Sequence, residues 1–236
     1  MKKLLLAGAA LAVTVAMGTA ADAASLLYRN DYATLGGTDY MGAAISASSF
    51  SVTSTSDDLS WFTLADYDVV VYANQNQSIP SGDLDALNAF IAGGGKVIFN
   101  DWTQSAGFNG QATYTGNNNQ TSITLGPQFS AGIVSPLSVV NTGWGTFAMG
   151  LASAGGTVAA TFGNGDAAIV VGNGGRTIVN GFLTDTVASQ QLYANELAGL
   201  GVGGAVPEPA TWAMMIAGFG LVGATLRDTR KKRVAA

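Results

Sequence analysis

Residues 68–100 contain a strand, a helix and a second strand in the order that builds a parallel β-sheet. The run 68–72 starts with Asp68 and continues with three β-branched valines and Tyr72, which is typical of a strand that is buried on both faces. Ser81 fits a helix N-cap, and apolar residues then recur at helical spacing until three glycines, 93–95, end the helix. A second apolar strand follows at 96–100. Because such units cross over right-handed in nearly all proteins, this stretch predicts an α/β fold.

The rest of the segment 24–201 supplies further elements around this unit. We expect a strand at 26–28, a helix capped by Thr38-Asp39, and a half-buried strand at 48–55. Strands are also expected at 157–162, 167–171 and 177–180, separated by tight hairpin turns, and a last helix is expected to be capped by Thr184-Asp185-Thr186. The stretch 101–150 is rich in Gly, Asn, Thr, Gln and Ser, so it is predicted to be an irregular, β-rich insertion. The sequence therefore predicts one α/β body, followed by a linker at 202–206 and a separate tail.

The N-terminus has the pattern of a secretory signal peptide. Met1-Lys2-Lys3 is a basic start, residues 4–17 are apolar, and Ala21-Asp22-Ala23 fits a small-x-small cleavage site. The apolar stretch is too short and wrongly flanked for a stable membrane span. We therefore expect Sec-type export machinery to recognise residues 1–23 and the peptide to be cut near Ala23.

The C-terminal tail, 207–233, contains a candidate membrane anchor. Its apolar run, 210–226, is near the lower length limit for a transmembrane helix. The basic residues after this run should stay in the cytoplasm, which places the body outside the inner membrane. These residues are Arg227, Arg230, Lys231, Lys232 and Arg233. A plain single-pass anchor explains the apolar run and the charges, but it does not explain Pro207-Glu208-Pro209 directly before them.

The whole tail resembles the PEP-CTERM sorting signal in the order and spacing of its parts. These parts are Pro207, Glu208 and Pro209, then Trp212 at the membrane interface, the small residues Gly218 and Gly220, and the terminal basic cluster, which Asp228 and Thr229 interrupt. The resemblance implies that a membrane-embedded exosortase recognises the tail, cleaves near Pro-Glu-Pro, and releases the body or transfers it to the cell surface. Members of the family are typically tied to exopolysaccharide and biofilm matrix. We therefore expect a protein that is anchored transiently by its C-terminal helix and ends at the cell surface or outside the cell.

The exported body is strongly acidic. Between residues 24 and 206 there are twelve acidic residues against three bases, a net charge of −9, because the other bases lie at the two ends of the chain. The negative electrostatic potential of such a body repels a phosphate backbone, so nucleic acid is excluded as a partner. The chain also has no cysteine, so an exported body must be stabilised by core burial rather than by disulfides.

The body resembles the class I glutamine amidotransferase-like, flavodoxin-like α/β proteins at residues 64–71, 87–99 and 175–181. The resemblance implies a three-layer sandwich with a mostly parallel sheet. Enzymes of that family use a nucleophilic cysteine on a strand-to-helix turn together with a histidine base. Here the turn carries Asn100-Asp101-Trp102, and the chain contains neither cysteine nor histidine, which also excludes a Ser-His-Asp triad. We therefore expect a non-catalytic descendant, and no cofactor or metal is part of this prediction.

Three carboxylates are candidates for ligand binding. Asp31, Asp101 and Asp185 each follow a predicted strand, where α/β sheets place their ligands. They could serve a paired-acid glycosidase or an oxygen-ligand calcium site. The alternative is that they cap helices and occupy turns, as aspartate commonly does.

Four aromatic residues in the insertion are candidates for stacking on sugar rings, while nearby amides bond the sugar hydroxyls: Trp102, Tyr114, Trp144 and Phe147. The alternative is that they pack the insertion onto the body. The leading hypothesis is a non-enzymatic exported surface or matrix protein that binds polysaccharide or a protein partner. The second hypothesis is a carboxylate-dependent, carbohydrate-active enzyme.

Overall fold

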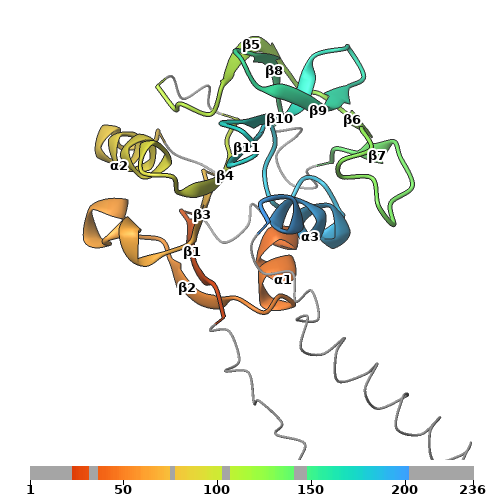
Figure 1. The fold of residues 1–236 in the computed structure, drawn as a ribbon. Helices are drawn as coiled ribbons and strands as arrows, with labels where there is room; N and C mark the ends of the chain where they lie inside the picture. The colour runs from red at the N-terminus through yellow and green to blue at the C-terminus, as the bar shows by residue number, and fades with distance from the viewer. Residues whose placement is uncertain (1–22, 32–36, 75–77, 103–106, 141–147, 202–236) are drawn as a thin grey trace, which may run out of the picture. The chain divides into compact units, whose positions relative to one another are not determined.

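A computed structural model describes residues 23–31, 37–74, 78–102, 107–140 and 148–201 (Figure 1). All of these residues belong to one compact unit, 23–205. Within the described ranges, no helix is long and apolar enough to cross a membrane. Three sequence predictions fall outside the described residues: the predicted signal peptide with Ala21, the predicted sorting tail with its candidate span 210–226, and the aromatic candidates Trp144 and Phe147.

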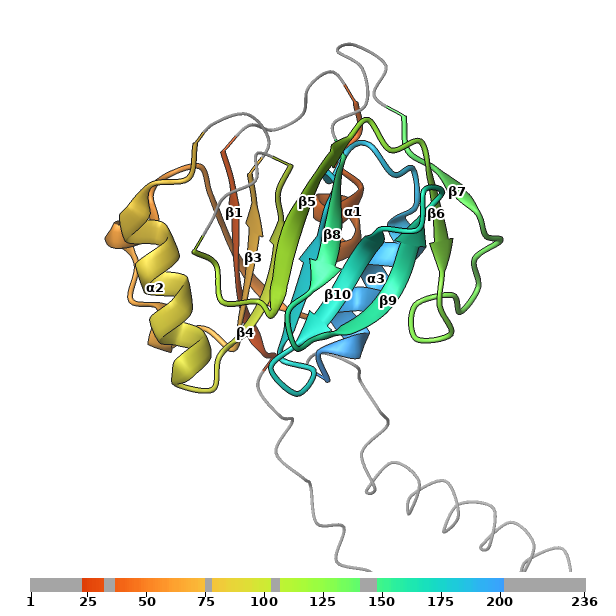
Figure 2. The ribbon, with the colours of Figure 1, turned by 90° about the horizontal axis from the view of Figure 1, so that it is seen from above.

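Among the described residues, eleven strands form one mixed sheet (Figure 2). One half is parallel, in the order β2 (Ser51–Thr55), β1 (Ser25–Asn30), β3 (Val69–Ala73), β4 (Lys96–Asn100) and β11 (Thr177–Asn180). The other half is antiparallel and continues through β10 (Ala167–Gly172), β9 (Thr157–Phe162), β6 (Ser122–Leu125) and β7 (Leu137–Ser138). Strand β8 (Met149–Ser153) pairs with β10 and with β5 (Ala112–Asn118).

The prediction of a mostly parallel sheet is therefore wrong for the second half of the chain. A parallel pair needs a crossover of a dozen or more residues, whereas β9, β10 and β11 are joined by short turns that allow only antiparallel pairing. Residues with positive φ shape these turns, including Gly165 after β9 and Asn173 after β10. The region 101–150 contains the predicted short β pieces, and they extend the sheet.

Helices cover both faces of the parallel half, so this half has the expected three layers (Figure 1). Helices α1 (Tyr40–Ser46) and α3 (Gln190–Gly199) lie on one face. Helix α2 (Ser81–Ala92) lies on the other face, together with the 3-10 turns η1 (Leu59–Trp61) and η2 (Leu64–Asp66). Alternate strand residues supply the two cores: Val71 packs in the core of α1 and α3, and Val70 packs in the core of α2.

The helix starts agree only partly with the predictions. Asp39 caps α1 as expected, because its Oδ1 accepts a 2.9 Å hydrogen bond from the Gly42 backbone N–H. Helix α2 begins at Ser81 itself, with Pro80 at the N-cap position. Helix α3 is capped by Ser189 rather than by residues 184–186, because the Ser189 hydroxyl accepts from the Leu192 backbone N–H.

The strand predicted at 48–55 also differs from the expectation. The observed strand β2 is exposed over almost its whole length rather than half-buried. It forms one edge of the sheet and pairs only with β1 among the described strands.

Candidate functional site

Polar residues end the parallel strands and gather at one edge of the sheet. Asn30 ends β1, Asn100 ends β4 and Asn180 ends β11, while Asn74 and Asp101 directly follow β3 and β4. The strand register pairs Asn30 with Ala73, Ala73 with Asn100, and Asn100 with Asn180, so these ends lie in one row. This edge is where open α/β sheets bind their ligands.

Asp101 is fully buried and lies among protein hydrogen-bond donors. Its Oδ1 accepts from Asn74 Nδ2 and its Oδ2 accepts from the Tyr114 hydroxyl, both at 2.8 Å. Burial, together with the neighbouring Asp101 carboxylate, raises the pKa of Tyr114 well above its ordinary value. Asp101 thus ties β5 to the ends of β3 and β4, and its candidate role in ligand binding stays a prediction.

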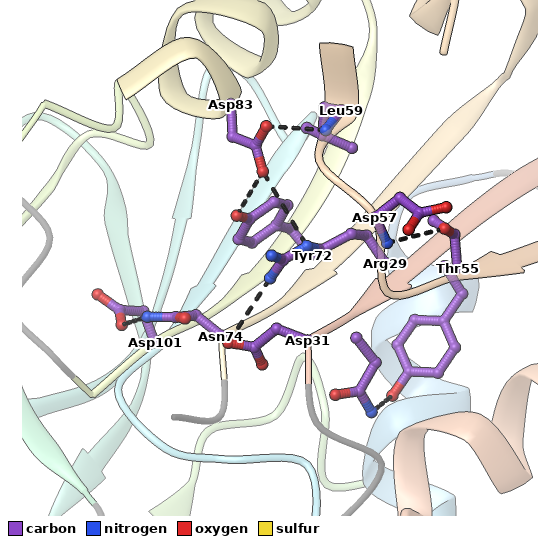
Figure 3. A network of polar contacts seen from close by, with 11 residues as sticks. Arg29, Asp31, Thr55, Asp57, Leu59, Tyr72, Asn74, Asp83 and Asp101 are labelled. Carbon is purple, nitrogen blue, oxygen red and sulfur yellow. Dashed lines mark hydrogen bonds and ion pairs between the residues drawn. The ribbon is translucent and has the colours of Figure 1, made fainter. Parts of the chain in front are cut away.

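A second polar network surrounds the buried Arg29 (Figure 3). Its guanidinium carbon lies 4.6 Å from the centre of the Tyr72 ring, its Nη1 lies 3.8 Å from Asp31 Oδ2, and its Nε lies 4.0 Å from Asp83 Oδ2. Asp83 also accepts hydrogen bonds from the Tyr72 hydroxyl and from the Leu59 backbone N–H. One base is therefore flanked by two acids, which reduces the cost of burying its charge.

The same network shifts the titration of Tyr72. Burial raises the pKa of Tyr72 well above its ordinary value, the positive charge of Arg29 opposes this shift, and the hydrogen bond to Asp83 adds to it. The phenol therefore stays neutral and donates to Asp83 throughout the physiological range.

A groove of about 1130 Å³ lies beside α1 and the ends of β1 and β2. Most of its lining residues carry hydroxyl, amide or carboxylate groups: Tyr28, Asn30, Asp31, Asp39, Ser46, Ser54, Thr55 and Ser56. Several polar groups that converge on one hollow are a usual mark of a ligand site, so this groove is the candidate functional site.

The polar groups on the α1 side of the groove hold one another in place. Asp39 Oδ2 accepts from the Tyr28 hydroxyl at 2.8 Å, and Asn30 Nδ2 donates to that hydroxyl at 2.9 Å. Burial and the neighbouring Asp39 raise the pKa of Tyr28 well above its ordinary value. A Cβ on Gly42 would collide with the Asp39 carboxylate, so only glycine leaves room for this arrangement.

The predicted site residues do not come together at one place. Asp31 lines the groove, Asp101 lies in its own buried network, and Asp185 lines a separate hollow of about 370 Å³ with Thr38 and Ser138. Trp102 is half-buried at the end of β4. Within the described ranges, no group of three or more acidic residues is placed to hold a metal ion.

The sequence prediction missed Tyr28, Asn30 and Asp39 as groove residues. One signal could have found them: Tyr28 and Asn30 alternate on one face of the first strand, and Asp39 was already identified as a cap of the helix that follows. A strand face and a helix start that are adjacent in the chain are good candidates for neighbours in the fold.

Comparison with known proteins decides the role of the tail. Residues 205–231 match the family model of the PEP-CTERM protein-sorting motif. The chain carries a PEP-CTERM sorting signal. The motif implies an exported protein that exosortase processes and that reaches the cell surface or the extracellular space. The PEP-CTERM match confirms the resemblance stated above for 207–233.

Solved structures confirm the fold of the body. A GMP synthase component from Thermoplasma acidophilum is 10% identical, with a TM-score of 0.53 over 76% of this chain and 94% of that chain. A glutamine amidotransferase is 11% identical, with a TM-score of 0.50 over 75% and 99%. An exo-β-1,4-mannosidase from Opitutaceae bacterium strain TAV5 is 12% identical, with a TM-score of 0.51 over 75% of this chain and 36% of that chain. At this identity the likeness extends to the amidotransferase-like fold alone, and no curated protein matches the sequence.

Proposed function

We propose that this PEP-CTERM protein is a non-enzymatic surface or matrix protein whose body binds exopolysaccharide in the groove beside α1, β1 and β2. The sorting motif supports delivery to the cell exterior, and the resemblance to PEP-CTERM proteins, which are typically tied to exopolysaccharide, suggests this polymer as the ligand. The observation that carries the binding proposal is the set of fixed polar groups in the groove, Tyr28, Asn30 and Asp39.

Sugar rings present rows of hydroxyl groups, which amides, carboxylates and hydroxyls recognise by hydrogen bonding. The Tyr28 phenol and the Asp39 carboxylate are already oriented by their mutual hydrogen bond, so binding would cost little side-chain entropy. Further along the groove, Ser54 and Thr55 add hydroxyl groups from the exposed strand β2. A partly open groove of this kind accommodates a segment within a long polymer.

The enzyme hypothesis has one observation in its favour, because Asp31 and Asp39 line the same groove. A glycosidase, however, needs one carboxyl that gives a proton to the leaving group. Asp39 accepts hydrogen bonds on both oxygens, and Asp31 lies beside the guanidinium of Arg29. Asp39 is thus hydrogen-bonded on both oxygens and Asp31 is paired with a positive charge, which supports binding over catalysis.

The test is calorimetry with the full-length protein in mild detergent and exopolysaccharide from the producing cells. We expect saturable binding, and Asn30→Ala should weaken it by about tenfold, because one lost hydrogen bond is worth roughly 1.4 kcal/mol. Asn118→Ala serves as the matched control, because Asn118 is exposed on β5 and does not line the groove. Absence of binding, or equal loss in both variants, would refute the groove as the site, and release of shorter sugars would favour the enzyme.

A further inference from the structure

The groove is acidic, and this feature restricts the polysaccharides that it can bind. Asp31 and Asp39 are the ionisable acids among its described lining residues, and no lysine or arginine is among them. Tyr28 adds no charge, because its pKa is raised. Arg29 is the nearest base, and its charge is shared between Asp31 and Asp83.

The remaining bases of the body lie at the opposite end of the parallel strands. Lys96 is the first residue of β4, and Arg176 directly precedes β11. Arg176 is also occupied there, because it donates hydrogen bonds to the backbone carbonyls of Ile91 and Asn173. At the carboxyl end, by contrast, the exposed Asp57 and Asp58 follow the groove residues of β2. At the amino end the two bases lie with the acids Asp66 and Asp68, so their charges balance, whereas the carboxyl ends of β1 and β2 carry an excess of acids.

This charge distribution separates three classes of polysaccharide. A polymer of uronic acids would bring carboxylates toward Asp31 and Asp39 and would be repelled. A neutral polymer would gain hydrogen bonds only. A polymer with free amino groups would gain charge-assisted hydrogen bonds to carboxylates, which are about twice as strong as neutral ones.

We propose that the groove selects polysaccharides that carry protonated amino groups, such as partly deacetylated hexosamine polymers, and that Asp39 is the carboxylate that receives the amine. This selection rests on the proposed binding of exopolysaccharide. Asp39 fits the role because it is fixed from three sides: Tyr28 and Asn30 orient its Oδ2, and the start of α1 holds its Oδ1. The amine would approach from the groove and meet a carboxylate that does not need to rearrange.

The test is calorimetry of the full-length protein with hexamers of glucosamine, of N-acetylglucosamine and of galacturonic acid. We expect the glucosamine hexamer to bind about tenfold more tightly than its acetylated form, and the uronate hexamer not to bind. Raising the ionic strength from about 0.02 M to about 0.3 M should weaken only the glucosamine hexamer, because it shortens the Debye length severalfold.

Asp39→Asn is the decisive variant. Asparagine caps a helix as well as aspartate does, so α1 should still form, but the charge is lost. The preference for the glucosamine hexamer should disappear. Asp85→Asn is the matched control: it makes the same change of net charge on an exposed position of α2, on the other face of the sheet, and should keep the preference.

Three results separate the possibilities. Equal, salt-independent binding of the glucosamine and acetylated hexamers would overturn the selection for amines and leave polysaccharide binding intact. Equal effects of the Asp39→Asn and Asp85→Asn changes would overturn the assignment to Asp39, because they would show a general field effect. Failure of every hexamer and of the producer's own polymer to bind would overturn both proposals.

Discussion

The side-chain amide of Asn180 donates one hydrogen bond to Glu196 Oε2 and another to Asn100 Oδ1, both at 2.9 Å. Glu196 lies on α3 and is fully buried. Burial raises the pKa of Glu196 from 4.5 to about 8, and the hydrogen bond from Asn180 only partly opposes this shift. The last helix is therefore joined to the ends of β4 and β11 through a carboxyl that is protonated at neutral pH.

This carboxyl should make stability fall as pH rises from about 4.5 to about 8. In that interval the folded protein keeps the Glu196 proton and the unfolded chain releases it, so the free energy of unfolding decreases until the pH exceeds about 8. Glu196→Gln keeps an acceptor for Asn180 but cannot ionise. In urea unfolding, the variant and wild type should differ little near pH 5, and the variant should be more stable by a few kcal/mol near pH 9. A difference that does not change with pH would contradict a buried, protonated Glu196.

The hydrogen bond from Tyr114 to Asp101 should hold the insertion strand β5 against the sheet. Tyr114→Phe removes the donor and leaves one oxygen of a buried carboxylate without it. We expect the free energy of unfolding to drop by about 1–3 kcal/mol, the usual cost of an unsatisfied buried group. Denaturant unfolding measures this loss. Asn118→Ala, at an exposed position of the same strand, should change stability by no more than about 0.5 kcal/mol. Similar losses of unfolding free energy in the two variants would show that the hydrogen bond from Tyr114 to Asp101 does not stabilise the fold.

Gly42 should be required for the groove rather than for the helix. Alanine favours a helix by about 1 kcal/mol over glycine, but here its Cβ would displace the Asp39 carboxylate and break both the helix cap and the bond to Tyr28. Loss of a cap costs about 1 kcal/mol and the second hydrogen bond about as much, so Gly42→Ala should be destabilised by roughly 1 kcal/mol and should lose polysaccharide binding.

The matched control for this prediction is Gly82→Ala in the first turn of α2. No atom lies within 4 Å of the added Cβ, so this variant should be as stable as wild type or slightly more stable. Thermal unfolding and calorimetry follow both properties. A Gly42→Ala variant that behaves like Gly82→Ala would refute the role of the Asp39 arrangement.

The sequence allowed good predictions where structure depends on local patterns. Strand β4 was predicted with its observed limits, 96–100, because an apolar run between a glycine stop and polar residues leaves little choice. The Asp39 cap was predicted because aspartate is a preferred residue at a helix start. The turns on either side of β10 indicated its hairpins, but the pairing of β11 with β4 and of β9 with β6 joins segments that are distant in the chain, and no single window contains that information.

The candidate site shows the same difference between local patterns, which the sequence contains, and contacts between distant segments, which it does not. Asp31 was selected because it follows a strand, and it lines the groove. Asp101 was selected on the same ground, yet it lies in its own network, because its partners Asn74 and Tyr114 come from other strands. Both side chains are buried, Asp31 beside Arg29 and Asp101 between Asn74 and Tyr114, and which partners such an aspartate meets depends on the segments that the fold brings to it.

The sorting motif makes the most direct prediction. Replacement of Pro207, Glu208 and Pro209 by alanines should abolish processing by exosortase, because the motif is the part of the tail that distinguishes it from a plain membrane anchor. Unprocessed protein should then accumulate in the membrane fraction at its higher mass, and the surface fraction should lose it. Cell fractionation with mass spectrometry of the C-terminus measures both effects. Alanine replacement of Gly203 and Gly204, which precede the matched segment 205–231, should leave processing unchanged. Normal cleavage and surface delivery of the triple variant would show that the Pro-Glu-Pro residues are not read by the protease.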